Sequence, residues 1–159
     1  MIGDIQKSIE LAELKYPDGT TKGAPNILIA LGLSCYTEYW GRLLTGIATG
    51  EGIRCFNAFF DKLGQPYVNV RNGKNEIYRK VRCGLAHTYL IEENSIIDMK
   101  PGLPCGIEYN IQTTYYTFHI PTYFEHFKNA VNDYISGLEV DTEKLSLMEQ
   151  ALTNKPELA

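Results

Sequence analysis

The chain has 159 residues, enough for one domain with a sizeable core and too few for two, so residues 1–159 are expected to form a single domain. Its 15 basic and 19 acidic residues give a net charge of −4, which argues against a protein that coats nucleic acid through overall charge. No apolar run approaches the roughly 18 residues of a membrane span, and the first residues lack a signal-peptide pattern. The expected location is therefore cytoplasmic.

Apolar periodicity predicts three helices in the first half of the chain. The first spans residues 2–16 and ends at a Pro-Asp-Gly turn. The second spans residues 26–44 and is apolar on all sides, as expected at the centre of a bundle or in an oligomer interface. A third helix over residues 53–63 follows the glycine-rich segment 46–52 and carries aromatic residues at core spacing.

Two charged residues interrupt the apolar second helix. Glu38 and Arg42 are four residues apart, so one helix face brings them within reach of each other. They form either an ordinary exposed ion pair or a support for a catalytic site.

The fourth predicted helix begins near residue 74 or 75 and carries an arginine and a histidine in apolar sequence. Arg82 is a permanent cation, and an arginine can donate two parallel hydrogen bonds to the oxygens of a phosphate. Histidine, with an ordinary pKa of about 6.5, exchanges protons near neutral pH. On one continuous helix Arg82 and His87 are about 140° apart around the axis and cannot meet. Either Gly84 allows a local distortion, or a second copy across a two-fold axis completes the site.

The local charge around this pair is positive. Residues 66–90 hold one acidic residue, Glu76, and five basic residues: Arg71, Lys74, Arg79, Lys80 and Arg82. Two interpretations stay open, a surface that attracts phosphate and an ordinary solvated helix face.

The second half of the chain begins with a β-rich segment. Alternation of β-branched and aromatic residues predicts one hairpin over about residues 106–120, with strands at about 106–111 and 115–120. A helix then runs from Pro121 to Gly137, and an acidic C-terminal helix covers about residues 141–153. The expected fold is mainly α, a helical bundle of five to six helices with one short β-hairpin insertion. His119 and His126 are expected to have surface or satisfied structural roles.

The cysteines form no C-x-x-C pair, and no histidine lies at zinc-finger spacing from them. They are expected to be reduced thiols that pack as small hydrophobic side chains, with no metal and no cofactor. Cys83 is the exception, because a cation beside it, Arg82, makes a thiol more reactive.

The pattern Arg82-x-x-x-x-His87, followed by Tyr89, resembles the R-x4-6-H signature of the HEPN superfamily. That resemblance implies a small helical domain that forms a homodimer, in which arginines and histidines of two protomers gather in one cleft. Many such domains are metal-independent ribonucleases, so RNA is the implied substrate. Cys83 departs from the pattern, since active members commonly have Asn, Asp or His after the arginine.

In the ribonuclease interpretation, His87 acts as general base or acid and Arg82 stabilises charge on the transferring phosphate. In the alternative interpretation, the protein is a non-catalytic dimeric HEPN-like module that binds RNA, a nucleotide or a protein partner. A third interpretation treats the motif as helix packing. The other candidate site residues fall into two groups, a substrate-binding group of Tyr78, Arg79, Lys80 and Tyr89 and a supporting group of Glu38, Arg42 and Cys83.

Overall fold

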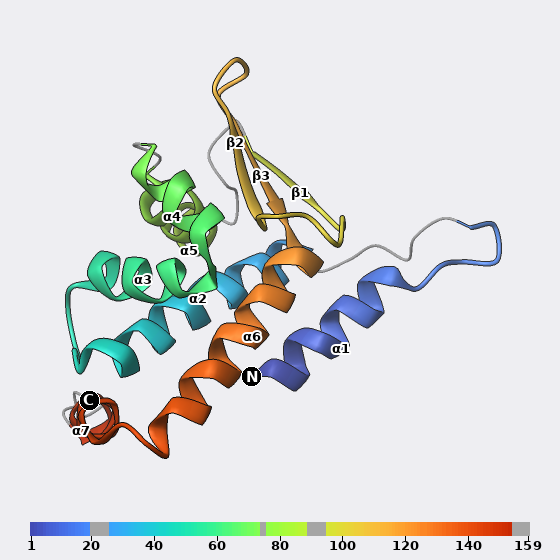
Figure 1. The fold of residues 1–159 in the computed structure, drawn as a ribbon. Helices are drawn as coiled ribbons and strands as arrows, with labels where there is room; N and C mark the ends of the chain where they lie inside the picture. Colours follow the sequence, from blue (N-terminus) through green and yellow to red (C-terminus); the bar gives the residue numbers. More distant parts are fainter. Residues whose placement is uncertain (20–25, 74–75, 89–94, 154–159) are drawn as a thin grey trace.

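The computed structural model describes residues 1–19, 26–73, 76–88 and 95–153. Within these ranges the chain forms seven α-helices, two short irregular helical segments and a three-stranded sheet (Figure 1). The protein is therefore mainly helical, as predicted. The described residues contain more helices than the predicted five or six and one strand more than the predicted hairpin. None of these helices combines the length and the apolar character that crossing a membrane requires.

The first three helices are α1 (Ile2–Glu13), α2 (Asn26–Thr45) and α3 (Gly52–Phe60). α1 is shorter than predicted because the backbone becomes extended at Leu14. α2 lies at the centre of the fold, where it contacts α1, α3, α6 and α7. This position explains why α2 is apolar on all sides.

α2 and α3 pack closely because Gly41 has no side chain. A Cβ atom at Gly41 would overlap the backbone carbonyl of Cys55 on α3. α3 is followed by a 3₁₀ turn, η1 (Asp61–Leu63). The last three residues of the predicted third helix are therefore 3₁₀-helical rather than α-helical.

The helix α4 (Gln65–Asn72) is not among the predicted helices, because a glycine and a proline close together, here Gly64 and Pro66, are typical of the end of a helix. In the structure Gly64, with a φ of 127°, is the N-cap of α4. Pro66 lies in the first turn, where the missing N–H costs no hydrogen bond. The same two residues therefore separate two helices.

The predicted fourth helix has two parts, a π-helical segment η2 (Tyr78–Cys83) and the short helix α5 (Gly84–Thr88). Its predicted start at residue 74 or 75 lies outside the described residues, as does Tyr89. Gly84 itself has ordinary helical dihedral angles, φ −56° and ψ −53°. A local distortion is present, but it precedes Gly84.

The sheet has the order β1-β3-β2 and consists of β1 (Ser95–Asp98), β2 (Ile107–Asn110) and β3 (Tyr115–His119). β2 and β3 form the predicted antiparallel hairpin. β1, which was not predicted, runs parallel to β3 and places Asp98 opposite His119.

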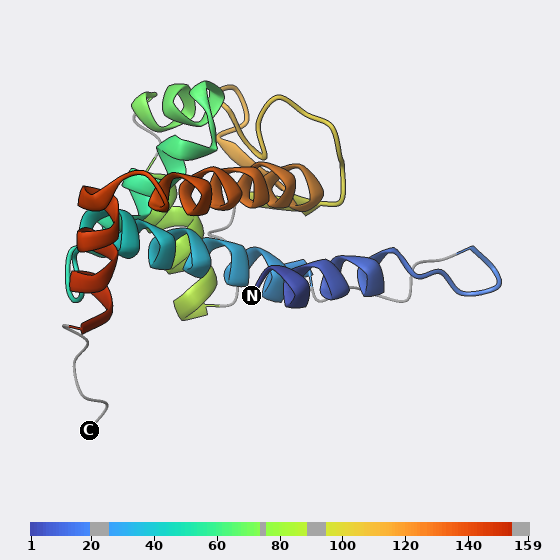
Figure 2. The same ribbon diagram turned by 60° about the horizontal axis from the view of Figure 1, so that its bottom comes forward.

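The helix α6 (Ile120–Leu138) follows β3 directly and lies alongside α2 (Figure 2). α7 (Thr142–Thr153) then packs against the C-terminal part of α2. The centre of the core is aromatic, with fully buried rings at Phe59, Phe60, Tyr67, Tyr123 and Phe127.

Candidate functional site

Glu38 is a buried acid at the meeting point of α2, α3 and η2. Its side chain is only 8% exposed. Glu38 Oε1 accepts a hydrogen bond from Arg42 Nη2 at 2.7 Å, and Oε2 lies 2.7 Å from Arg82 Nε. The predicted pairing of Glu38 with Arg42 is therefore present, but the pair is partly buried rather than exposed, and Arg82 is a second partner. One carboxylate thus joins two arginines from two helical segments.

Arg82 is held on two sides. Its Nε–H is not aligned with Glu38 Oε2, so this contact is an ion pair without a hydrogen bond. The guanidinium Cζ lies 5.6 Å from the centroid of the Tyr78 ring, at cation–π range. Burial lowers the pKa of Arg82, but the charge of Glu38, together with smaller contributions from Tyr78, Cys35 and Cys83, outweighs it and holds that pKa above its ordinary value. Arg82 is therefore a fixed, fully charged cation whose side chain is still 22% exposed.

Tyr78 closes the network. Its hydroxyl donates to Glu38 Oε2 at 3.4 Å, and burial, followed by the charge of Glu38, raises the pKa of Tyr78. The hydroxyl therefore stays protonated near neutral pH. Tyr78 and Arg82 face Glu38 together because they are four residues apart in η2, and π-helical turns of this kind are frequent at functional sites.

The glycine-rich segment before α3 is attached to the same network. Arg42 Nη1 donates to the carbonyl oxygens of Ala48 and Gly50, at 3.1 and 3.2 Å. Gly52 begins α3, and a Cβ there would lie 2.9 Å from Glu38 Oε1 and would overlap the Tyr78 hydroxyl. The absence of a side chain therefore allows the N-terminus of α3 to approach the carboxylate, where the helix dipole favours negative charge.

The other predicted site residues are only partly assembled. Arg79 projects into solvent, 76% exposed, with Glu76 at 4.0 Å. Lys80 is half-buried and next to it in sequence. His87 lies on α5, directly after η2, but its side chain is outside the described part of the chain. The structure therefore brings Glu38, Arg42, Tyr78 and Arg82 together and does not place the His87 side chain.

All four cysteines are free thiols. Cys55 and Cys105 are buried, whereas Cys35 and Cys83 are half-buried near the network. Burial raises the pKa of Cys35 and that of Cys105, the latter to about 11. These two thiols are therefore not activated nucleophiles.

Two histidines outside the motif have partners that sequence reasoning missed. His119 Nδ1 lies 2.6 Å from Asp98 Oδ1, and its Nε2 lies 3.4 Å from Glu108 Oε2. His126 Nδ1 lies 2.7 Å from the hydroxyl of the buried Tyr67. His119 is buried rather than on the surface, and the partnership with Asp98 depends on the unpredicted strand β1.

Comparison with known proteins gives no relative from which a role can be transferred. No protein-family model, no curated protein and no solved structure matches this chain. In the described ranges, no group of three or more His, Cys, Asp or Glu side chains is arranged to hold a metal ion. The partly buried Glu38–Arg42–Arg82–Tyr78 network, hereafter the Glu38 network, is the most chemically distinctive feature of the described residues, and a functional assignment depends on its geometry.

Proposed function

We propose that this protein is a HEPN-like endoribonuclease that cleaves single-stranded RNA without a metal. The observation that supports this most is the way Glu38 fixes Arg82, because a buried carboxylate 2.7 Å from Nε determines where the guanidinium points. We propose that the Nη groups of Arg82, whose side chain is still 22% exposed, are the donors offered to a ligand. A phosphate accepts two parallel hydrogen bonds from an arginine in this way.

The proposed reaction uses the 2′-hydroxyl of the RNA as nucleophile. His87 removes the proton of that hydroxyl, the oxygen attacks the adjacent phosphate, and Arg82 stabilises the charge that develops on the phosphate oxygens. A protonated histidine then gives a proton to the departing 5′-oxygen. The products are a 2′,3′-cyclic phosphate and a 5′-hydroxyl end. This proposal also gives a reason for the contacts that fix Arg82, because a cation that stabilises a transferring phosphate must be held in place.

The second candidate is a non-catalytic, dimeric HEPN-like module that binds RNA, a nucleotide or a protein partner. The ion pair with Glu38 favours it, since an arginine that neutralises a buried acid has a structural role of its own. In that case RNA or a nucleotide binds at Arg82 without being cut, or a partner binds without RNA.

The deciding experiment is cleavage of a 5′-labelled single-stranded RNA in the presence of EDTA. We expect products with a 2′,3′-cyclic phosphate, and a loss of rate of about 10²-fold or more in His87→Ala. Arg82→Ala should also lose most activity. Matched controls are Arg54→Ala, an exposed arginine paired with Glu51, and His126→Gln, both of which should cleave normally at neutral pH.

Two results would contradict the catalytic proposal. Cleavage that persists in His87→Ala would remove the proposed acid–base residue, and a strict requirement for a divalent metal would remove the proposed mechanism. RNA binding that is lost in Arg82→Ala, without any cleavage by the unaltered protein, would favour the non-catalytic module.

A further inference from the structure

The strand β2 forms one edge of the sheet, and part of its backbone points outward. Within the described residues β2 pairs only with β3. The N–H of His119 donates to the carbonyl of Gly106 at 2.9 Å, so Gly106 belongs to a hydrogen-bonded pair of the antiparallel ladder. Because such pairs alternate, Ile107 and Tyr109 direct their backbone groups away from β3. The Ile107 N–H faces the Cys105 sulfur and Ile107 is only 1% exposed, so among the described residues this alternation leaves the two backbone groups of Tyr109 at the edge of the sheet.

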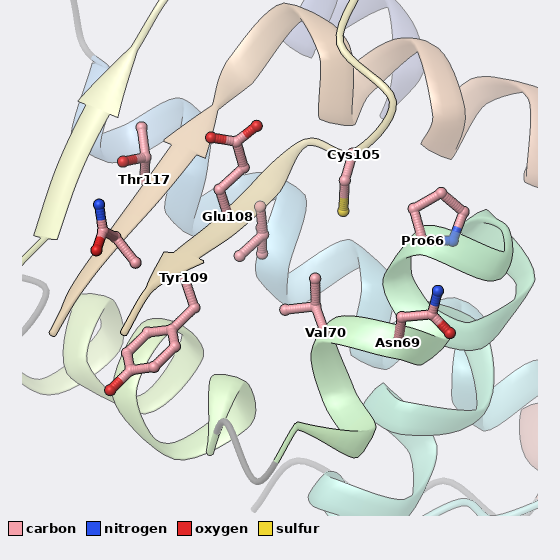
Figure 3. Close-up of a pocket in the computed structure, with 9 residues that line it drawn as sticks. Pro66, Asn69, Val70, Cys105, Glu108, Tyr109 and Thr117 are labelled. Atoms are coloured by element: carbon pink, nitrogen blue, oxygen red, sulfur yellow. The ribbon is translucent and has the colours of Figure 1, made fainter. Parts of the chain in front are cut away.

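A groove of about 600 Å³ runs along this edge, between β2 and α4 (Figure 3). Its volume lies in the range of about 300–1,000 Å³ that is typical of ligand sites. The groove has an apolar wall and a polar wall. The apolar wall includes Pro66, Val70, Cys105, Ile107 and Tyr109, and the polar wall includes Glu108, Asn110 and Thr117.

The two walls follow from the pleat of β2. Successive side chains of a strand point to opposite faces, so Ile107 and Tyr109 share one face and Glu108 and Asn110 the other. Figure 3 shows Glu108 and Tyr109 on opposite sides of the strand. Among the described residues that line the groove, Glu108 is the single charged one, and its side chain is 57% exposed. An added strand would therefore meet apolar contacts on one face and a negative charge on the other.

We propose that β2 binds an extended peptide as an added strand, with apolar residues toward α4 alternating with basic residues toward Glu108. The outward N–H and carbonyl of Tyr109 supply the hydrogen bonds, as in other cases of strand addition. The acid supplies the selectivity for basic side chains. This proposal does not depend on the ribonuclease proposal, because Arg82 is not among the described residues that line the groove.

A second copy of this chain fits the same edge poorly. Two-fold pairing of β2 with β2 would bring two Glu108 carboxylates to one interface, where like charges repel. It would also bring α4 of each copy to the shared edge, because α4 forms the opposite wall of the groove. A single extended chain avoids both conflicts.

The test uses a labelled, acetylated and amidated peptide of six alternating lysine and valine residues, followed by fluorescence anisotropy and by amide shifts in NMR spectra. We expect saturable binding, with the largest shifts at residues of β2 and α4. Glu108→Lys should weaken binding at least tenfold, and Glu108→Gln should weaken it less. Glu149→Lys is the matched control, since it makes the same charge change on the exposed side of α7 and should not alter binding.

Two control peptides separate the contributions of charge and backbone. A peptide with glutamate in place of lysine should not bind, and one with a central proline in place of valine should bind much more weakly, because proline has no N–H. The proposal is overturned by an absence of saturable binding, by equal binding of the glutamate peptide, by unchanged affinity in Glu108→Lys, or by shifts that map away from β2. Circular dichroism of each variant checks that the fold is retained.

Discussion

Glu38 is the residue on which the Glu38 network depends most. Glu38→Gln keeps the size of the side chain but removes the charge that compensates Arg42 and Arg82. Because Glu38 is buried, the loss should lower the free energy of unfolding by about 3 kcal/mol, as measured by urea denaturation at neutral pH. Glu51→Gln is the control, since the Glu51–Arg54 pair is exposed and its loss should change stability by less than about 0.5 kcal/mol. Equal losses in both variants would mean that the charge of Glu38 contributes no more stability than the exposed charge of Glu51.

His126 should make the protein sensitive to acid. The Tyr67 hydroxyl accepts a hydrogen bond from the Gly106 N–H at 2.8 Å, so its own proton is directed to His126 Nδ1. Burial lowers the pKa of His126 below its ordinary value, so the neutral form is favoured in the folded state. Because the unfolded chain then binds the proton more tightly, stability is full above about pH 6.5 and falls as the pH drops through the folded-state pKa.

The variant His126→Gln isolates this effect, because glutamine offers an acceptor to Tyr67 but takes no proton. Between about pH 7.5 and pH 5, the free energy of unfolding should fall more in the unaltered protein than in His126→Gln. Urea denaturation at both pH values measures the difference. An identical fall in the two proteins would show that other groups cause the acid sensitivity.

At the scale of elements, the crossing of α2 and α3 depends on Gly41. Alanine at this position would place a methyl group against the backbone of Cys55, which cannot move aside as a flexible side chain can. Gly41→Ala should therefore destabilise the protein by about 3 kcal/mol or prevent folding, as measured by thermal unfolding. Gly3→Ala in α1 is the control, because no atom lies within 4 Å of the added Cβ, and it should be neutral or slightly stabilising. A tolerated Gly41→Ala would show that the helices can separate without cost.

The elements that sequence reasoning found are those with long periodic patterns. Both ends of α2 and both ends of α6 were predicted to within one residue, because each helix has several turns of regular apolar spacing. α4 was missed because a proline is common both just after the end of a helix and in the first turn of a new one, so Pro66 did not distinguish the two cases. β1 has only four residues, and its parallel pairing with β3 depends on tertiary contacts.

The same distinction applies to the site. The pairing of Glu38 with Arg42 follows from their spacing on one helix, so the sequence contains it. The burial of that pair and its extension to Arg82 depend on how η2 packs against α2, which no local pattern encodes. The sequence did contain one signal for this burial, a charged pair on a helix that is otherwise apolar. Charges on such a helix are expected to be buried, and buried charges need partners.

At the scale of the whole molecule, we propose that two chains share the site. Arg82 and His87 lie on consecutive helical segments, and an ideal helix separates residues at this spacing by about 140° around its axis. A site that uses both residues is more readily completed by a second copy across a two-fold axis. Light scattering should therefore give twice the 18.0 kDa mass of the chain.

Mixed dimers test whether the two residues act from different chains. Arg82→Ala and His87→Ala should each be inactive alone, but a mixture refolded together contains dimers with one intact arginine and one intact histidine, on opposite protomers. If the site spans the two-fold axis, this mixture should regain part of the RNA cleavage rate, because proton transfer and charge stabilisation again meet at one phosphate. The control mixes His87→Ala with the double variant Arg82→Ala/His87→Ala, which supplies no histidine and should stay inactive. An active monomer would place the reaction within one chain. A mixture that forms dimers and remains inactive would exclude a site shared between two chains.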